Sequence, residues 1–344
     1  MRKRIDYIDF TKGIAIFLVV WGHAIQVGGM QREVFSDKLF TFIYSFHMPL
    51  FMMLSGFVFA KTYNRKDFWK NIKSKITRLV FPAILWGVLF YIIKAVMENY
   101  LLKNFYPFSI NQVVNEIWDV WYLWSLFFCT VAALIIGQMP NKITRFIVLL
   151  LSFILLYYMP NGEFNVFLFP YFLIGYILGK RENIPIKYCC LSLIMFPVLL
   201  MYYSKEHYIY VSGITRMCGD LGVGRQIFID VFRWVIGLTG SISVITIVKL
   251  FLGYLSNESR IRKTFCELGK YTLEIYVMQR ILVEYMGAKV MWKIVNEMNI
   301  SILSNEFVYD YIFTLLFTIA FVFILYNMSV IYRKVVNCLK VNMH

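Results

Sequence analysis

Residues 9–25 read DFTKGIAIFLVVWGHAI, an apolar run with charged or polar side chains near both ends. Asp9 and Lys12 lie before its apolar centre, and Gly22 and His23 follow it. A helix of this length approaches the ~20 residues needed to cross ~30 Å of hydrocarbon. The stretch therefore predicts a first membrane span, and its ionisable groups require an explanation because charge is costly at membrane depth.

The composition of the whole chain favours a membrane protein. Its 344 residues are 60% hydrophobic and 16% charged, with a mean hydropathy of +0.64, which is more apolar than an ordinary globular domain. We expect an all-α polytopic membrane protein with about ten transmembrane helices, forming a single integral-membrane domain over residues 1–344. The expected spans are 11–28, 40–60, 79–97, 121–138, 146–160, 164–179, 188–203, 228–251, 271–289 and 310–332.

The placement of basic residues predicts the orientation. With both termini in the cytoplasm, most of the 35 Lys and Arg residues lie on the cytoplasmic side. The connection at 61–78, KTYNRKDFWKNIKSKITR, has seven basic residues against one Asp, a strong positive-inside signal. The net charge of +15 therefore indicates topology and contact with anionic membrane lipid, and not a nucleic-acid partner. We expect a multi-pass protein of a bacterial cytoplasmic membrane.

Other common sequence signals are absent. The N-terminal run resembles a signal peptide, but no A-x-A-like cleavage site follows it, so we interpret it as a mature span. We infer neither a disulfide framework nor a metal site, because no C-x-x-C spacing occurs among the six cysteines at 129, 189, 190, 218, 266 and 338. There is no P-loop and no G-x-S-x-G elbow. The ionisable groups within the spans remain as candidate functional residues.

Helical phase places three of these groups on one stripe of the first span. Eleven steps of 100° from Lys12 to His23 make three turns plus about 20°, so both side chains leave the same face about 16 Å apart. Asp9 lies within about 40° of that face. An isolated histidine near a helix end usually makes a structural hydrogen bond. The shared stripe instead favours a site with a cytoplasmic cation and an imidazole in the outer half of the membrane.

The second span carries its own polar set. His47 lies near the outer end of that span, so we expect it in the same half of the membrane as His23 and on a neighbouring helix. A structural role is at least as good an explanation as a catalytic role for Pro49, which would kink the helix, and for Ser55-Gly56, which would form a packing notch.

Charged residues also occur in later spans. Asp230 and Arg233 are spaced i, i+3, and Arg280 and Glu284 are spaced i, i+4, so both sets predict local ion pairs. Glu274 has no partner at such a spacing, which makes it a candidate site residue.

Five segments in this order resemble the membrane-bound acyltransferase 3 family, in particular the branch similar to fucose 4-O-acetylase. They are DFTKGIAIFLVVWGH at 9–23, SFHMPLFMMLSGF at 45–57, RLVFP at 78–82, WYLWSL at 121–126 and LGKYTLEIYVMQ at 268–279. The first two segments are specific, and the others are weak alone. The family has about ten spans and O-acylates sugars of surface polysaccharides and oligosaccharides. The resemblance thus implies acyl-CoA, in this branch acetyl-CoA, as donor substrate, a surface or lipid-linked carbohydrate as acceptor, and no tightly bound cofactor.

The resemblance also implies roles for residues of the first two segments. His23 would be the general base on a sugar hydroxyl, or would first take the acyl group itself. His47 would assist, for example as a donor to the oxyanion of the thioester. Lys12 and Arg78, with the basic connection, would contact the phosphates of CoA, and Asp9 is expected to pair with one of these two cations.

Other candidates belong to the acceptor side. Trp121 and Tyr122 begin the fourth span, which we expect at the outer surface, and fit either an interfacial aromatic belt or a platform for the sugar. Tyr122 and Gln279 are further candidate donors to the oxyanion. The chain departs from many family members at two positions, with Lys12 in place of Arg and Gln279 in place of His. An amide at 279 does not support proton transfer, but it could bind a hydroxyl.

Two other classes of function stay open. A flippase or transporter of a lipid-linked sugar, without acyl transfer, would also have many spans and buried charges, but the two halves show no matching pair of interrupted helices. A structural or regulatory membrane protein would leave the stripe of Lys12 and His23 unexplained.

Overall fold

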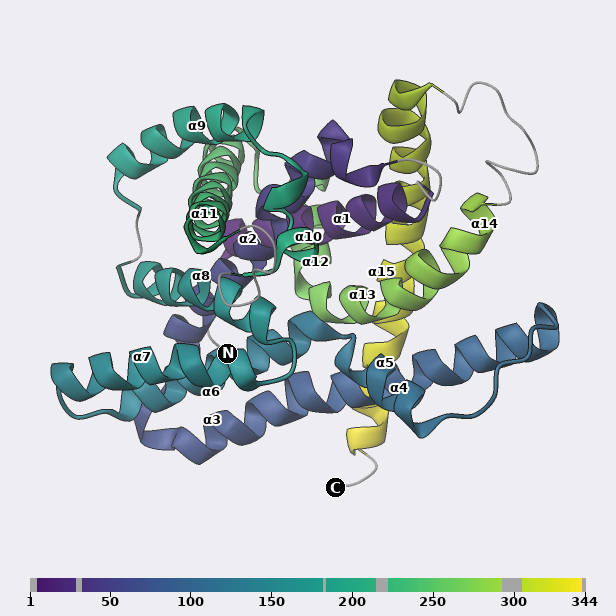
Figure 1. Cartoon of the computed structure of the whole chain (residues 1–344), viewed down its shortest axis with the longest axis horizontal. Helices are drawn as coiled ribbons and strands as arrows, with labels where there is room; N and C mark the ends of the chain where they lie inside the picture. Colours follow the sequence, from purple (N-terminus) through teal and green to yellow (C-terminus); the bar gives the residue numbers. More distant parts are fainter. Residues whose placement is uncertain (1–4, 29–32, 182–183, 215–221, 293–304, 342–344) are drawn as a thin grey trace. The chain divides into compact units, whose positions relative to one another are not determined.

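The computed structural model describes residues 5–28, 33–181, 184–214, 222–292 and 305–341, and within these ranges every regular element is a helix (Figure 1). The prediction of an all-α polytopic protein is confirmed. The chain forms two compact units, unit 1 of Met1–His47 with Val244–His344 and unit 2 of Met48–Ser243. The boundaries fall inside α2 (Lys38–Thr62) and α11 (Val223–Tyr254).

Unit 1 combines the two ends of the chain. Besides the first part of α2 and the last part of α11, its described elements are α1 (Asp6–Gly28), the 3-10 turn η1 (Val34–Ser36), α12 (Arg260–Lys270), α13 (Thr272–Gln279), the π-helix η7 (Arg280–Gly287), α14 (Ala288–Trp292), the π-helix η10 (Val308–Phe313) and α15 (Thr314–Val341).

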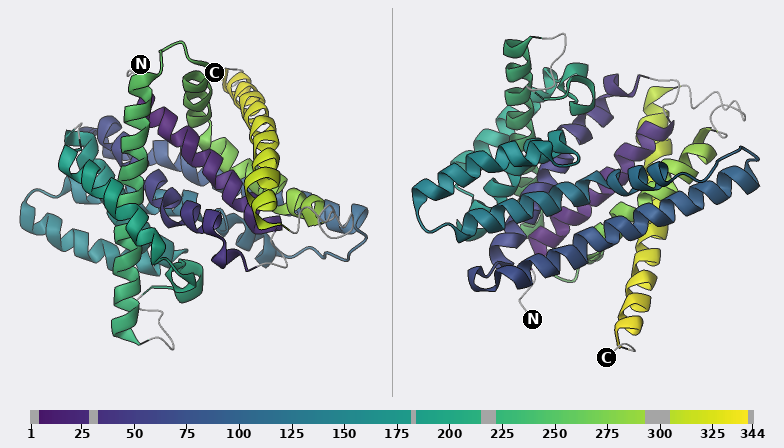
Figure 2. Two further views of the ribbon diagram at one scale, coloured as in Figure 1. Left: turned by 90° about the horizontal axis from the view of Figure 1, so that it is seen from above. Right: turned by 60° about the horizontal axis from the view of Figure 1, so that its bottom comes forward.

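Unit 2 contains the middle of the chain. Its further elements are η2 (Arg65–Asp67), α3 (Phe68–Lys75), the π-helix η3 (Ile76–Val80), α4 (Phe81–Val96), the π-helix η4 (Met97–Leu101), α5 (Ile110–Trp118), α6 (Trp121–Gln138), α7 (Lys142–Tyr158), α8 (Gly162–Arg181), α9 (Ile186–Met201), η5 (Lys205–His207) and α10 (Ile209–Ser212). The run from α3 to η4 forms one long helical rod (Figure 2, right).

Seven described helices are long and apolar enough to cross a membrane: Asp6–Val27, Lys38–Thr62, Arg65–Leu101, Trp121–Gln138, Gly162–Arg181, Val223–Tyr254 and Val308–Cys338. Three expected spans are also helical but fall outside this set. The spans 146–160 and 188–203 overlap α7 and α9, which have 17 and 16 residues, and 271–289 contains a π-helix and several charges. The multi-pass architecture is confirmed, and the count of ten stays a prediction.

Glycines let α1 and α12 meet backbone to backbone in unit 1. A Cβ atom on Gly13 would lie 2.0 Å from the carbonyl oxygen of Phe265, and one on Gly269 would lie 1.8 Å from that of Asp9. Small residues permit this close approach between membrane helices. The glycines of D-F-T-K-G and L-G-K therefore belong to a single contact, which fixes the N-terminal half of α1.

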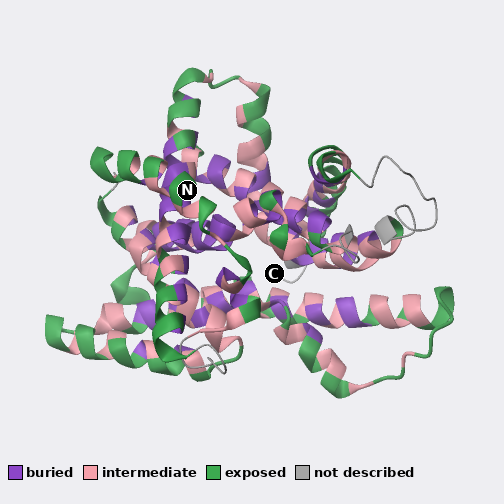
Figure 3. Ribbon diagram, turned by 45° about the horizontal axis from the view of Figure 1, so that its top comes forward, coloured by how far each residue is buried: buried purple, intermediate pink, exposed green. Residues whose placement is uncertain are grey.

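Glycines have the same role in unit 2, between α2 and α8. A Cβ on Gly56 would lie 2.0 Å from the carbonyl oxygen of Phe172, and one on Gly175 would lie 1.9 Å from that of Met53. Gly56 is therefore a packing notch. Both units keep long exposed helix faces (Figure 3), as lipid-covered helices require.

The five described cysteines, at 129, 189, 190, 266 and 338, are free. Cys218 lies outside the described residues, as do the first basic residues of the tail at 2–4.

Candidate functional site

His23 has a carboxylate partner from the distant C-terminal part of unit 1. Its Nδ1 atom lies 3.5 Å from Oε1 of Glu284, and the two side chains are 23% and 30% exposed. Gln279 donates its Nε2 hydrogen to the same oxygen at 2.7 Å. The imidazole of the first span, a carboxylate and an amide thus form one partly buried polar cluster.

The π-helix η7 explains why Gln279 and Glu284 meet. Five residues of an α-helix turn the chain by 500°, which leaves two side chains about 140° apart. Gln279 directly precedes η7, whose wider turns pair residues at i, i+5. Both side chains therefore reach the same face. The ion pair of Arg280 and Glu284 stays a prediction, and its i, i+4 spacing assumes a regular α-helix, whereas both residues lie in the π-helix η7.

The cluster favours one tautomer of His23. An ionised carboxylate only accepts hydrogen bonds, so the Nδ1–H of a neutral ring faces Glu284 and the lone pair lies on Nε2. The separation of 3.5 Å exceeds the 2.7–3.2 Å range of a hydrogen bond, but catalytic contacts often tighten when substrate binds. In Ser-His-Asp triads a carboxylate at Nδ1–H orients the histidine in the same way.

Gln279 offers a second chemical group. Its Oε1 atom is buried and has no hydrogen-bond partner among the described residues. An acceptor in this state is stabilised by any hydroxyl that reaches it.

Tyr44 lies between the two predicted catalytic histidines. Its ring centroid is 6.4 Å from that of His23 and 4.7 Å from that of His47, both edge-on, and its hydroxyl donates to Gln26 at 3.0 Å. A Cβ on Gly22 would lie 2.8 Å from the Tyr44 ring, so glycine before the histidine provides room for the tyrosine. The expectation that spans one and two bring their histidines to one region agrees with these contacts.

The hydrogen bond of His47 limits its chemistry. His47 is 4% exposed, and its Nδ1–H donates to the carbonyl of Ile43 at 2.8 Å. A carbonyl cannot donate, so the neutral ring carries its lone pair on Nε2. In this form His47 is an acceptor or base. The predicted donation to an oxyanion would require the charged imidazolium.

Glu274 has a partner that its spacing could not indicate. Arg333, 59 positions later on α15, donates Nη2 to Glu274 Oε2 at 2.8 Å and also to the carbonyl of Lys270. The guanidinium lies 4.1 Å over the ring of Tyr271. These contacts tie α13 to α15.

Asp9 and Lys12 are half-buried on the part of α1 that packs against α12.

Tyr122 lies in the first turn of α6, at the expected start of that span in unit 2. Its side chain is 7% exposed, and its hydroxyl is 3.3 Å from that of Ser55 on α2. Trp121 stacks on Phe164 at 4.3 Å. Arg78 is exposed on η3.

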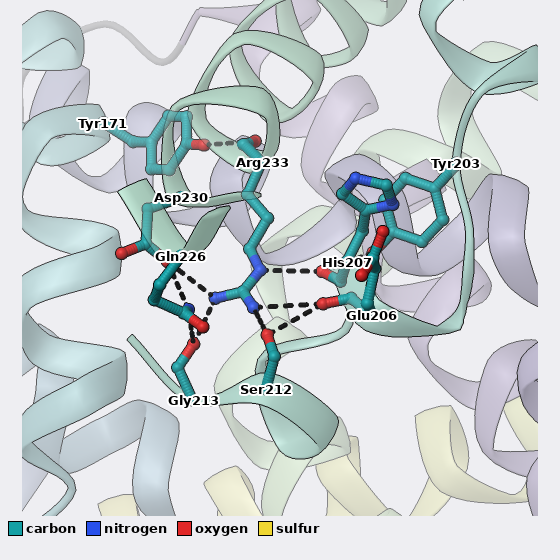
Figure 4. A network of polar contacts seen from close by, with 9 residues as sticks. All are labelled: Tyr171, Tyr203, Glu206, His207, Ser212, Gly213, Gln226, Asp230 and Arg233. Atoms are coloured by element: carbon teal, nitrogen blue, oxygen red, sulfur yellow. Dashed lines mark hydrogen bonds and ion pairs between the residues drawn. The ribbon is translucent and has the colours of Figure 1, made fainter. Parts of the chain in front are cut away.

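A larger network surrounds Arg233 in unit 2 (Figure 4). The predicted pair is confirmed, since Nη1 lies 3.2 Å from Oδ1 of Asp230. The guanidinium also donates to the carbonyls of His207 at 2.8 Å and Glu206 at 3.3 Å, and to Gly213. Sequence spacing indicated only the local pair. The network fastens the connection between α9 and α11 onto the side of α11.

His207 caps this connection. Its Nδ1 atom accepts the backbone N–H of Ser204 at 2.9 Å. Burial lowers the pKa of His207 below its ordinary value, although the Glu206 carboxylate acts in the opposite direction.

Comparison with known proteins identifies the family. The acyltransferase 3 family, described as an acyltransferase domain, matches residues 5–327 of this chain. The nodulation protein NolL of Sinorhizobium fredii is 24% identical over 298 residues, covering 79% of this chain and 76% of that protein. NolL of Mesorhizobium japonicum is 23% identical over 291 residues, covering 79% and 74%. No solved structure matches the chain.

The family match includes α1, α13 and η7, which carry the cluster of His23, Gln279 and Glu284. Together with the membrane-length helices, it confirms the prediction of an acyltransferase. This chain belongs to the acyltransferase 3 family and is a membrane O-acyltransferase.

Proposed function

We propose that the protein transfers an acetyl group from cytoplasmic acetyl-CoA to a hydroxyl of a surface or lipid-linked sugar. Family membership and the resemblance to sugar O-acetylases support this assignment, and similarity to nodulation proteins is compatible with it. The single observation that carries the proposal is the position of Glu284 next to His23. This position supports the proposal because a carboxylate at Nδ1 would orient His23 as a general base.

In the proposed reaction Glu284 holds the Nδ1–H of His23. The Nε2 lone pair takes the proton of the sugar hydroxyl while the oxygen of that hydroxyl attacks the thioester carbon. The C–O bond forms and the C–S bond breaks, and His23 returns the proton to the departing thiolate of CoA. A positioned base of this kind typically contributes ~10²- to 10⁴-fold.

A two-step variant uses the same groups. Nε2 of His23 attacks the thioester carbon first, and the C–S bond breaks to release the CoA thiolate, which leaves an N-acyl imidazolium that keeps its Nδ1–H. The oxygen of the sugar hydroxyl then attacks the acyl carbon and loses its proton to a second base. The C–N bond breaks to restore neutral His23, and the second base passes its proton on to the CoA thiolate. Nε2 of His47 fits that role, because its Nδ1–H is engaged with Ile43.

The remaining candidates have supporting roles in this proposal. Gln279 would accept a hydrogen bond from an acceptor hydroxyl at its buried Oε1. Lys12 and Arg78 would contact the phosphates of the donor, with Asp9 orienting Lys12. Trp121 and Tyr122 would border the sugar, and Glu274 would support α13 from its pair with Arg333.

The test is transfer of label from radioactive acetyl-CoA to the host's surface glycan by the purified protein in liposomes. We expect His23→Ala to abolish transfer and His207→Asn, which changes another buried histidine, to leave it intact at neutral pH. Equal transfer by His23→Ala and the parent would contradict the mechanism. Movement of unmodified glycan across the liposome without acyl transfer would instead favour a transporter.

A further inference from the structure

Unit 2 contains a cavity of about 440 Å³ among helix ends that the charge pattern predicts to be cytoplasmic. Its lining comes from the end of α2, η2, the end of α6, the first turn of α7 and the end of α8. Small-molecule sites in proteins have volumes of this order. The cavity lies within one unit, so its form does not depend on the placement of the other.

Three cationic side chains reach the cavity from three separate elements. Arg65 and Arg145 are anchored to the backbone, since Arg65 donates Nη2 to the carbonyl of Gln138 at 2.9 Å and Arg145 donates Nε to that of Met139 at 3.1 Å. Both Nη groups of Arg145 remain for a ligand. In the part of the chain that the structure describes, no carboxylate lies within ion-pair distance of Arg65, Arg145 or Lys180. The positive charge is therefore not neutralised by these residues.

Two tyrosines form flat walls beside the cations. Tyr63 stacks on Phe59 with ring centroids 5.1 Å apart, and Tyr176 packs against the same phenylalanine at 5.6 Å. The ammonium of Lys180 lies 4.4 Å over the Tyr176 ring. Burial raises the pKa of Tyr63, so its hydroxyl stays protonated and available as a donor.

We propose that this cavity binds a nucleotide from the cytoplasm, with Arg65, Arg145 and Lys180 contacting its phosphates and the two tyrosines bordering its base. Planar guanidinium groups match phosphate oxygens at two points, and aromatic rings stack on bases of any kind. The assignment rests on the proposed function in one respect. Acyl-CoA ends in a phosphorylated adenosine diphosphate, which makes it the expected ligand. Its phosphates would then be bound by the cations of this cavity in place of the predicted contacts with Lys12 and Arg78.

An anionic lipid headgroup is the competing source of phosphate. It would satisfy the three cations equally well, but it has no aromatic base to occupy the space beside Tyr63 and Tyr176. A binding experiment in membranes of defined composition separates the two sources.

The experiment uses the full chain in phosphatidylcholine nanodiscs and measures binding of CoA, adenosine 3′,5′-bisphosphate and pantetheine by calorimetry. We expect the double variant Arg145→Gln, Lys180→Gln to weaken both phosphorylated ligands about 10-fold or more, because charge-assisted hydrogen bonds are lost. Pantetheine binding is expected to stay unchanged. The matched control is Lys142→Gln, which removes a cation from the same turn of α7 outside the cavity lining and should change affinity by less than about 2-fold.

Unchanged nucleotide affinity in the double variant would overturn the inference. The inference would also be overturned if, in phosphatidylglycerol nanodiscs, the parent protein lost CoA binding and the double variant kept it. That result would mean that the anionic lipid occupies the cavity. If instead only the proposed acyl transfer were wrong, nucleotides would still bind in the cavity, but the parent protein would transfer no acyl group. His23→Ala should bind CoA normally and fail only in transfer.

Discussion

Oε1 of Glu284 lies 3.5 Å from Nδ1 of His23 and 2.7 Å from Nε2 of Gln279, so one carboxylate oxygen connects the first membrane helix with a π-helix late in the chain. The histidine is oriented from outside its own helix. In the proposed mechanism its Nε2 atom is the reactive nitrogen, and the following expectations depend on this arrangement and on the contacts that support it.

Glu284→Gln tests the orientation of His23. The neutral amide keeps the shape of the side chain but no longer stabilises an imidazolium, so we expect kcat for acyl transfer to fall about 10- to 100-fold with little change in acceptor KM. Glu267→Gln on α12, paired with Lys270, is the control for loss of one carboxylate. An unchanged kcat in Glu284→Gln would exclude Glu284 from the mechanism.

Gln279→Leu tests the open amide oxygen. The leucine removes both the donor to Glu284 and the buried acceptor Oε1, so we expect KM for the glycan to rise about 10-fold while KM for acetyl-CoA is unchanged. Gln279→His supplies a polar ring and should retain more activity than leucine. Steady-state kinetics with each substrate varied in turn checks this. Equal rises in both KM values would indicate a general packing defect.

Gly13→Ala tests the contact between α1 and α12. The new Cβ would lie 2.0 Å from the backbone oxygen of Phe265, which cannot give way as a side chain can, so we expect a loss of about 1–3 kcal/mol in the free energy of unfolding. Gly253→Ala is the matched control, because no heavy atom lies within 4 Å of its Cβ position. Thermal stability in detergent, measured by size-exclusion chromatography, should fall only for Gly13→Ala.

Arg233→Gln tests the network in Figure 4. Its side chain is 3% exposed, so its removal leaves Asp230 and several carbonyls without their donor and should cost about 3–5 kcal/mol. Arg225→Gln removes a 62% exposed partner of Glu206 and should cost less than about 1 kcal/mol. Limited proteolysis in liposomes should detect faster cleavage between residues 203 and 213 in Arg233→Gln alone.

His207 predicts a pH dependence of the same connection. Its pKa in the folded protein is below the ordinary value of 6.5, so the unfolded connection binds the proton more tightly. The stability from neutral His207 is present above pH 6.5 and is lost as the pH falls below it, since protonated Nδ1 cannot accept the N–H of Ser204. Hydrogen exchange of residues 203–213 should accelerate at pH 5 relative to pH 7.5. His207→Asn, whose oxygen replaces the acceptor, should weaken this dependence; an identical dependence would assign it to another group.

The sequence by itself determined the membrane architecture and drew attention to the candidate histidine of the first span. Long apolar runs can satisfy their backbone groups in lipid only as helices, so span length and composition were sufficient for the all-α fold. His23 was identifiable because it shares one helix face with Lys12, and the i, i+3 pair of Asp230 and Arg233 was identifiable because both members lie on one helix.

Tertiary structure decided the partners that lie on other helices or depend on irregular turns. Glu284 reaches Gln279 through a π-helix, Glu274 pairs with Arg333 at a distance of 59 positions, and Tyr122 lies buried against Ser55. Periodicity describes one regular helix at a time. It contains no information on which helices become neighbours, how far one extends past another, or where a wider turn changes the face that a side chain occupies.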